Sequence, residues 1–479
     1  MRRAKIVATL GPALDDPARL KAALAAGVDV VRLNFSHGTH EEHANRLEQV
    51  RETAGALGRT VGALGDLQGP KIRLGSLPET GVQLEDGSEV VLLAGRDELD
   101  EYDDGAGTVT LPVSYEELAD DVEPGALILV DDGLLRLVVS RVDGHAVHAR
   151  VVAGGTAWSR KGVNLPGVDV SAASLTDKDR EDVQVMVDLE VDWIALSFVR
   201  RASDITELRA LVTELGGEAP VIAKLERPEV LDSLEDIIAA TDGVMVARGD
   251  LGVEIGPERV PALQKQIIAL SNRRGKPVIT ATEMLESMIR NPRPTRAEAS
   301  DVANAIFDGS DAVMLSGETA AGRYPVETVR TMARIIEVAE DSAHLVTPPQ
   351  PPSEDLSVAR VVSRAAVQAA NDVHAKALVV FSLSGSSIQL VSKFRPTMPI
   401  VGLTTRERAR RRTALMWGVE SELVPERDHT RDLIVAAEDA VLKGGYGQKG
   451  DAIVIVSGLP GGHGGTNRLV VHRLGQAPD

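Results

Sequence analysis

The sequence has no cysteine among its 479 residues, which excludes disulfides, thiolate metal sites and a cysteine nucleophile. Aromatic residues make up only 3%, so surfaces that stack nucleic-acid bases are not expected. No apolar run approaches the roughly 20 residues that cross a bilayer, and the opening MRRAKIVATLGP lacks the apolar region of a signal peptide. These absences predict a cytoplasmic protein without a membrane segment.

Positive charge is also scarce. The chain has 52 Lys and Arg against 71 Asp and Glu, which gives a net charge of −19. Such a chain has no long-range field to attract nucleic acid or an anionic membrane, so neither is expected as a partner. Any anionic substrate must be held by a local cluster of Lys and Arg.

Hydrophobic patterning divides the chain into segments of different character. The length alone predicts about three domains of ~150 residues each. At the start, strand and helix patterns alternate as βαβαβ, which favours a parallel sheet. Residues 71–166 instead show short alternating strands between Gly and Asp turns, which predicts an inserted antiparallel β domain. Helix and strand alternation then resumes with five more short strands.

Three strands before the insertion and five after it make eight. With helices between them and polar residues after them, they predict an α/β fold of the (β/α)₈ TIM-barrel type, formed by residues 1–70 and 167–345. The antiparallel, barrel-like β domain of residues 71–166 would interrupt it after strand 3 as a lid. A Pro-rich stretch, His344 to Leu356, predicts a linker. Residues 355–479 predict a C-terminal α/β regulatory domain.

The chemistry is suggested most clearly between Val221 and Ile255. Lys224 ends one apolar strand, Glu226 follows it, and Asp250 lies just past the next strand. Two carboxylates without His or Cys nearby make a hard oxygen site suited to Mg²⁺ or Mn²⁺, and the adjacent lysine suggests a phosphoryl group across the metal. A surface salt bridge at two strand ends is the alternative, and this spacing leaves both open.

Polar and basic side chains also follow other strands. They are Arg32, Asn34, Ser36 and His37 after the second strand, Asp66, Lys71 and Arg73 after the third, and Arg160 and Lys161 in the return from the insertion. Arg293 and Arg296 lie in a tight turn before the last barrel strand. They have either a functional role or only a structural one, at a helix whose capping box runs from Thr295 to Glu298.

A Ser-rich loop stands out in the last domain. One strand runs into the loop and a helix follows, so that its exposed amides could hold a phosphate. An ordinary strand-to-helix turn is the alternative, because the loop has no basic residue. The loop residues are Ser382, Ser384, Gly385, Ser386 and Ser387.

Nearly the whole chain resembles the pyruvate kinase family. The resemblance rests on KIVATLGPA, VVRLNFSHG, GDLQGPKIR, SRKGVNLPG, VIAKLERPE, MVARGDLGVE, TATEMLESM, NPRPTRAEASDVANA and DAVMLSGETAAGRYP, in this order. It implies Mg²⁺-dependent phosphoryl transfer from phosphoenolpyruvate to ADP, giving pyruvate and ATP in the last step of glycolysis. It also implies a homotetramer and a possible phosphorylated allosteric effector.

The resemblance further implies roles for individual residues. Lys224 matches the lysine that contacts the transferring phosphoryl group and steadies the enolate, and Arg32 matches the group that grips the substrate phosphate. Gly249 and Thr282 lie where the family holds the substrate carboxylate. Thr282 or a nearby water, with Ser316 and Glu318 behind it, supplies the proton to the enolate. The remaining matches are Glu226 and Asp250 as Mg²⁺ ligands, Asn34, His37, Arg73 and Lys161 as nucleotide contacts, and Ser197 and Phe198 as pocket wall, where core packing is the alternative for Phe198.

The resemblance also bears on monovalent cations. Many members bind K⁺ with groups matching Asn34, Ser36, Asp66 and the backbone of Leu67, and carry an acidic residue where this chain has Lys71. The residues Leu67, Gln68, Lys71 and Leu74 resemble the branch that works without K⁺. An ammonium at Lys71, beside Asp66, would supply the positive charge and repel the ion. We therefore expect K⁺ not to be required.

The Ser-rich loop resembles the phosphate loop of the family's allosteric site. Leu383 and Ser386 sit where members that respond to fructose bisphosphate often have basic residues, and the closing loop offers only Arg468 and His463. Two phosphates would be poorly neutralised. A singly phosphorylated effector, or none, is expected.

Two other functions compete with this interpretation. Barrel aldolases or lyases that act on pyruvate or its enol also use Glu and Asp on Mg²⁺, but they lack the inserted and the last domains. A catalytically silent regulatory homologue is opposed by the presence of every matched catalytic residue.

Overall fold

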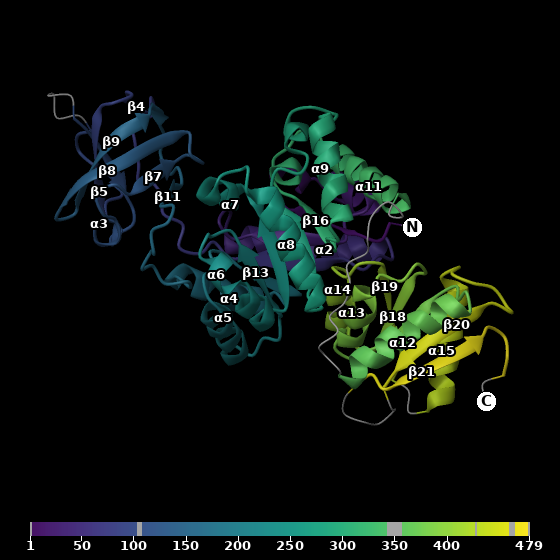
Figure 1. Ribbon diagram of the computed structural model, residues 1–479. Coiled ribbons are helices and arrows are strands. Elements are labelled where there is room, and N and C mark those ends of the chain that lie inside the picture. Colours follow the sequence, from purple (N-terminus) through teal and green to yellow (C-terminus); the bar gives the residue numbers. More distant parts are fainter. Residues whose placement is uncertain (1, 103–107, 343–356, 427–428, 459–464, 478–479) are drawn as a thin grey trace.

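The computed structural model describes residues 2–102, 108–342, 357–426, 429–458 and 465–477. Eight parallel strands close into a barrel in the order β1-β16-β15-β14-β13-β12-β3-β2, which confirms the predicted (β/α)₈ fold (Figure 1). The strands are β1 (Lys5–Thr9), β2 (Val30–Asn34), β3 (Gly62–Asp66), β12 (Trp193–Leu196), β13 (Val221–Leu225), β14 (Gly243–Ala247), β15 (Val278–Ala281) and β16 (Ala312–Leu315).

Helices cover the barrel, and their ends follow local sequence signals. The predicted capping boxes are both present, with Thr176 bonded to Asp179 and Thr295 bonded to Glu298. Within the residues described, no helix is long and apolar enough to cross a membrane. The helices are η1 (Pro12–Leu14), α1 (Pro17–Ala26), α2 (His40–Ala56), α4 (Asp177–Asp188), α5 (Ala202–Glu214), α6 (Val230–Ala240), α7 (Arg248–Ile255), α8 (Val260–Arg273), η2 (Glu286–Ile289), α9 (Arg296–Phe307), α10 (Gly317–Ala320) and α11 (Pro325–Asp341).

The barrel core has two layers because successive strand residues point to opposite faces. Val7 and Ile222 belong to one buried cluster. Their neighbours Ile6 and Val221 belong to a second cluster, which the helices cover. The strands are therefore apolar on both faces, as parallel sheets require. Polar side chains are left to gather at the strand ends.

The inserted segment forms a separate β domain, seen apart from the barrel at the upper left of Figure 1. A six-stranded sheet has the order β11-β7-β8-β9-β5-β6, and β10 pairs with β4. The sheet is mostly antiparallel as predicted, but β5 and β6 pair in parallel. Its elements are β4 (Val82–Leu84), β5 (Glu89–Ala94), β6 (Val109–Val113), α3 (Leu118–Asp121), β7 (Leu127–Val130), β8 (Leu135–Asp143), β9 (Ala146–Ala153), β10 (Gly155–Ala157) and β11 (Val163–Asn164).

The last domain is a five-stranded α/β unit of order β19-β18-β17-β20-β21, in which only the edge strand β21 is antiparallel. Two of its strands, β19 and β21, were not expected from the sequence. The predicted linker, His344 to Leu356, lies outside the described residues. The elements are α12 (Val358–Asp372), β17 (Leu378–Phe381), α13 (Ser386–Lys393), β18 (Ile400–Thr404), α14 (Glu407–Thr413), β19 (Val419–Leu423), α15 (Thr430–Lys443), β20 (Ala452–Ser457) and β21 (Arg468–Arg473).

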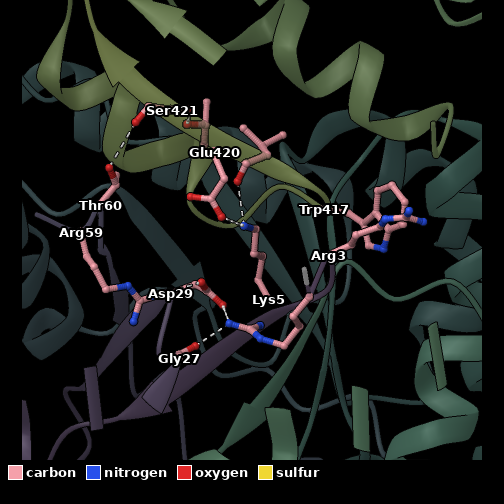
Figure 2. A network of polar contacts seen from close by, with 12 residues as sticks. Arg3, Lys5, Gly27, Asp29, Arg59, Thr60, Trp417, Glu420 and Ser421 are labelled. Carbon is pink, nitrogen blue, oxygen red and sulfur yellow. Dashed lines mark hydrogen bonds and ion pairs between the residues drawn. The ribbon is translucent and has the colours of Figure 1, made fainter. Parts of the chain in front are cut away.

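The last domain packs against the amino-terminal end of the barrel strands. Figure 2 shows Lys5, at the start of β1, reaching into this domain, where its Nζ donates a 2.8 Å hydrogen bond to the carbonyl of Val419. The backbone N–H of Gly418 donates to the carbonyl of Arg3 at 2.8 Å. The guanidinium of Arg3 also lies 5.3 Å from the centre of a Trp417 ring. This contact leaves the carboxyl ends of the strands open.

Candidate active site

Polar side chains from most of the barrel strands gather at the open, carboxyl end. In (β/α)₈ barrels this is the end that carries the chemistry. The predicted residues found there are Arg32 and Asn34 on β2, Asp66 on β3, Ser197 just after β12, Lys224 on β13, Glu226 just after it, Asp250 in α7, Thr282 after β15 and Ser316 after β16.

Lys224 lies at the centre of this group. Its Nζ is 3.3 Å from Oδ1 of Asp66 and 3.5 Å from Oε2 of Glu226. It also donates a hydrogen bond to the Ser197 hydroxyl at 2.5 Å. Although burial alone would lower it, the pKa of Lys224 is raised by the charges of Asp66 and Glu226. The ammonium is therefore charged, although it is only 12% exposed.

Asp66 connects Lys224 to Arg32. Nε of Arg32 donates to Oδ2 of Asp66 at 2.6 Å, and its Nη1 donates to Oγ1 of Thr9 at 3.1 Å. Burial alone would raise the pKa of Asp66, but the charges of Lys224 and Arg32 bring it below the usual range. The sequence interpretation placed Lys71 beside Asp66; in the structure, Arg32 and Lys224 are the ion-pair partners of Asp66.

Glu226 has the surroundings of a metal ligand. Its side chain is fully buried, and its Oε1 accepts a 2.7 Å hydrogen bond from the backbone N–H of Phe198. Within the described part of the chain, no group donates a hydrogen bond to its Oε2. Burial raises the pKa of Glu226 to about 7, against the opposing charge of Lys224. A buried carboxylate oxygen without a donor fits a ligand for a hard cation.

Phe198 takes a left-handed backbone conformation to reach Glu226. Its φ of 54° is uncommon for a bulky side chain. Gly69 packs so closely behind it that a Cβ at Gly69 would lie 2.8 Å from the Phe198 ring. The backbone amide of Phe198 thus holds Glu226, a role that the sequence did not indicate.

Asp250 is the second candidate ligand, in the first turn of α7. Its Oδ1 lies 3.7 Å from Nζ of Lys71. Among the described residues, no three His, Asp or Glu side chains come together to hold an ion by themselves. Glu226 and Asp250 nevertheless fit Mg²⁺ or Mn²⁺, because such ions commonly take one or two carboxylates and fill the remaining positions with water and substrate oxygens.

Gly249 and Thr282 approach each other closely. A Cβ at Gly249 would lie 2.8 Å from Cγ2 of Thr282, so only glycine leaves room here. Thr282 and Glu283 have positive φ values of 74° and 56°. Arg248, which the sequence interpretation missed, donates to the carbonyl of Thr282 at 2.6 Å. Arg248 could have been identified from the sequence, because it lies directly between the end of β14 and Gly249.

Ser316 and Glu318 follow β16, the last strand of the barrel. The fully buried Glu318 accepts hydrogen bonds from the backbone N–H of Ser316 at 2.6 Å and of Leu285 at 3.1 Å. Glu318 therefore ties together the loops after β15 and β16.

The predicted nucleotide contacts are only partly brought together. Burial, followed by the charges of Arg73, Arg32 and Lys71, lowers the pKa of His37, which places His37 in a positive environment. Lys161 instead pairs with Asp131 of its own domain at 2.8 Å.

A cavity of about 1300 Å³ opens between the inserted domain and the barrel. Lys71, Gly249, Asp250 and Thr282 line it, and it continues toward α8 and α9. Lys224, at the bottom of the barrel mouth, is not in its lining. The deep charged group and the wide cleft thus meet at Asp250 and Thr282.

Two other predicted regions lie away from this centre. Arg293 and Arg296 are exposed beside the capping box of α9. In the Ser-rich loop, the Ser382 hydroxyl accepts from the N–H of Gly385 at 3.0 Å, and the Ser384 hydroxyl donates to that of Ser386 at 3.0 Å. Ser387 bonds Thr466 and Arg468 donates to Thr430, while His463 lies outside the described residues.

Comparison with known proteins is consistent over the whole chain. Residues 1–329 match the family model described as pyruvate kinase, barrel domain, and residues 360–472 match the pyruvate kinase alpha/beta domain. Pyruvate kinase of Agrobacterium vitis is 45% identical over 479 residues, 99% of each chain. That of Mycobacterium intracellulare is 45% identical over 478 residues, again 99% of each chain. A crystal structure of a pyruvate kinase from Cryptosporidium parvum has a TM-score of 0.89 at 34% identity, covering 99% of this chain and 96% of that one.

Proposed function

This chain belongs to the pyruvate kinase family of phosphotransferases, and on that premise we propose that its barrel site transfers the phosphoryl group of phosphoenolpyruvate to ADP, giving pyruvate and ATP, with Mg²⁺ as cofactor. One observation carries the proposal. The Lys224 ammonium lies between Asp66 and Glu226 at the open end of the barrel, with Arg32 on the other side of Asp66. Phosphoryl transfer needs little from a protein except such fixed charge and positioning.

The substrate phosphoryl group is assigned to Arg32 and Lys224. Both cations are mostly buried, and Asp66 fixes the direction of each. A guanidinium can bond two phosphate oxygens at once, and the ammonium of Lys224 can follow the charge as it passes to the enolate oxygen. Because the two cations are oriented in advance, little reorganisation accompanies the reaction.

Glu226 and Asp250 would hold Mg²⁺, or Mn²⁺ in its place. The ion would neutralise charge on the phosphoryl group and orient it for transfer. The backbone of Gly249 and the hydroxyl of Thr282 would receive the substrate carboxylate. We assign protonation of the enolate to the Thr282 side of the site, through its hydroxyl or a water, with Ser316 and Glu318 behind it.

ADP would occupy the wide side of the cleft, with its phosphates near Asn34, His37 and Arg73. Lys161 would join them after leaving Asp131, when the inserted domain closes over the barrel. The cytoplasmic location and homotetrameric assembly expected from the family belong to the same proposal.

The site would work without K⁺. Among the groups expected at a K⁺ position, Asp66 is already neutralised by two cations. The carbonyl of Leu67 accepts a 2.6 Å hydrogen bond from Ser197, and the Asn34 side-chain oxygen accepts one from the N–H of Ser36 at 3.2 Å. Few of these oxygens are free to replace the water around an ion.

The Ser-rich loop would accept one phosphate at most. Its hydroxyls bond one another and its amides, and Leu383 is exposed where a basic side chain would help. Arg468 is held by Thr430 at 2.7 Å. Fructose 1,6-bisphosphate should therefore not activate the enzyme, and micromolar activation in a titration would contradict this part of the proposal.

A steady-state assay tests the function directly. Pyruvate formation is followed with phosphoenolpyruvate, ADP and Mg²⁺, with K⁺ present or replaced by an inert cation at equal ionic strength. We expect Mg²⁺-dependent turnover that is the same in both buffers. Absence of pyruvate would refute the function, whereas strong stimulation by K⁺ would refute only the cation assignment.

A further inference from the structure

Helix α4 holds the loop after β2 from behind. Nζ of Lys178 donates a 2.8 Å hydrogen bond to the carbonyl of Phe35 and lies 2.6 Å from Oδ2 of Asp182. The fully buried Asp182 also lies 2.7 Å, through Oδ1, from Nε2 of His40 at the start of α2. The loop between β2 and α2 is thus held by one helix at its first residue, Phe35, and just past its end, at His40.

Lys178 fixes the orientation of a single peptide group. The carbonyl of the Phe35–Ser36 peptide accepts from Lys178, and its N–H donates to Oδ1 of Asn34 at 3.2 Å. This peptide plane cannot turn without breaking both hydrogen bonds. The side chain of Asn34 is therefore oriented by a peptide that Lys178 anchors, and His37 follows it directly.

The neighbouring residue of α4 fixes the next loop. Oδ1 of Asp179 accepts a 3.0 Å hydrogen bond from the N–H of Gly69, while its Oδ2 accepts from the backbone and hydroxyl of Thr176. Gly69 is two residues before Lys71. The first turns of α4 thus join the two loops on the nucleotide side of the site.

We propose that Lys178 is a positioning residue for nucleotide binding, acting through the Phe35–Ser36 peptide on Asn34 and His37. This inference rests on the proposed function, in which those two side chains meet ADP. Lys178 itself would touch neither substrate.

Lys178 is partly exposed, so a role in positioning the loop can be distinguished from a role in stabilising the fold. Its side chain is 49% exposed, and its buried partner Asp182 keeps a contact with His40 when Lys178 is lost, so the cost in stability should be limited. Its hydrogen bond to Phe35 spans two elements far apart in sequence and acts on a loop backbone. Removing it should change the geometry of the loop more than the stability of the barrel.

The test compares three variants in the intact enzyme. Lys178→Met keeps the length of the side chain and removes the charge and the hydrogen bonds. Lys178→Arg keeps the charge and can again donate to Phe35. Arg180→Met is the matched control, because Arg180 lies on the same helix in a half-exposed ion pair with Glu207 at 2.5 Å, directed away from the loop.

For Lys178→Met we expect KM for ADP to rise about tenfold, since a displaced binding group weakens contacts that depend on distance and direction. KM for phosphoenolpyruvate and the Tm should stay close to wild type, because Arg32 and Lys224 have other anchors. Lys178→Arg should recover most of the affinity for ADP, and Arg180→Met should behave as wild type.

Unchanged KM for ADP in Lys178→Met, or equal changes in Arg180→Met, would overturn the inference. A parallel fall of Tm and of both affinities would also overturn it, because that is what a purely structural role predicts. If Lys178→Met does not fold, Lys178→Gln, which also removes the ammonium but keeps a polar side chain at this half-exposed position, replaces it with the same criteria. Inactive wild-type enzyme would instead refute the proposed function.

Discussion

The ammonium of Lys71 lies 3.7 Å from the carboxylate of Asp250. Lys71 follows the third barrel strand and Asp250 belongs to α7, so the pair spans the mouth of the site near the start of the inserted domain. Asp250 is also a candidate metal ligand. A fixed positive charge therefore lies next to the proposed Mg²⁺ position.

Reversing this charge should create a requirement for K⁺. Lys71→Glu removes the ammonium and adds a carboxylate beside Asp250, which would attract a monovalent cation. We expect the variant to be slow in K⁺-free buffer and to be stimulated by K⁺, with little stimulation of the wild type. The measurement is initial rate against K⁺ concentration at constant ionic strength, with Lys71→Gln as the uncharged control. Equal K⁺ response in all three proteins would contradict this role of Lys71.

Loss of the Lys224 ammonium should stop the chemical step. Lys224→Met leaves Asp66 paired with Arg32 but removes the charge that would stabilise the enolate. We expect kcat to fall by at least about 10³-fold, in line with the loss of a group that stabilises transition-state charge. Circular dichroism and Tm should show that the variant is folded. A folded variant with a rate near wild type would disprove the assignment.

The contact between Gly249 and Thr282 can be tested with a pair of glycines on one helix. A Cβ at Gly249 would lie 2.8 Å from Cγ2 of Thr282, whereas one at Gly252 would meet Val260 at an ordinary 3.5 Å. Gly249→Ala should displace Thr282 and raise KM for phosphoenolpyruvate by about tenfold or more. Gly252→Ala should leave KM unchanged. Similar values for the two variants would show that the close approach has no effect on substrate binding.

Lys393, at the contact between the barrel and the last domain, should make the folded protein more stable as the pH rises through the alkaline range. Nζ of Lys393 lies 2.5 Å from Oδ2 of Asp311 and 2.8 Å from Oδ1 of Asn272. Burial lowers the pKa of Lys393 to about 8, because Asp311 offsets only part of the cost of enclosing the ammonium. Between this value and the ordinary value of 10.5, the folded chain binds fewer protons than the unfolded chain.

The contribution of Lys393 to the free energy of unfolding is therefore fully present above about pH 10.5 and is lost as the pH falls to about 8. Lys393→Met removes this dependence while keeping a side chain of similar length. We expect the Tm of the wild type, relative to the variant, to rise by a few degrees between pH 7.5 and pH 10. A constant difference in Tm across this range would mean that Lys393 titrates normally.

Much of the barrel and part of the site could be predicted from the sequence. Apolar strands that end in charged residues are a local pattern, so Lys224, Glu226 and Arg32 could be assigned to strand ends by position alone. Capping boxes such as Thr176 with Asp179 are equally local. A closed barrel then brings these ends together without further information.

Other features depend on packing that no local pattern contains. Asp66 meets Arg32 and Lys224 because of the register between strands, and the backbone of Phe198 bonds Glu226 only because the chain turns left-handed there. Strand β19 reads VESEL, a charged sequence whose strand conformation is set by pairing with β18. Arg248 acts through the carbonyl of Thr282, and sequence does not indicate backbone partners.

The insertion after β3 has a consequence for synthesis on the ribosome. Leu64 of β3 pairs with Trp193 of β12, and Ala8 of β1 pairs with Leu315 of β16. The first three strands therefore have two unpaired edges during synthesis. The edge at β3 gains its partner β12 only after the whole inserted domain has been made, and the edge at β1 gains its partner only when β16, the last barrel strand, has been made. The inserted domain has its own core, and its paired strands are closer together in the sequence, so it can fold as it emerges. The exposed edges of β1 and β3 are then the parts of the nascent chain most open to misassociation.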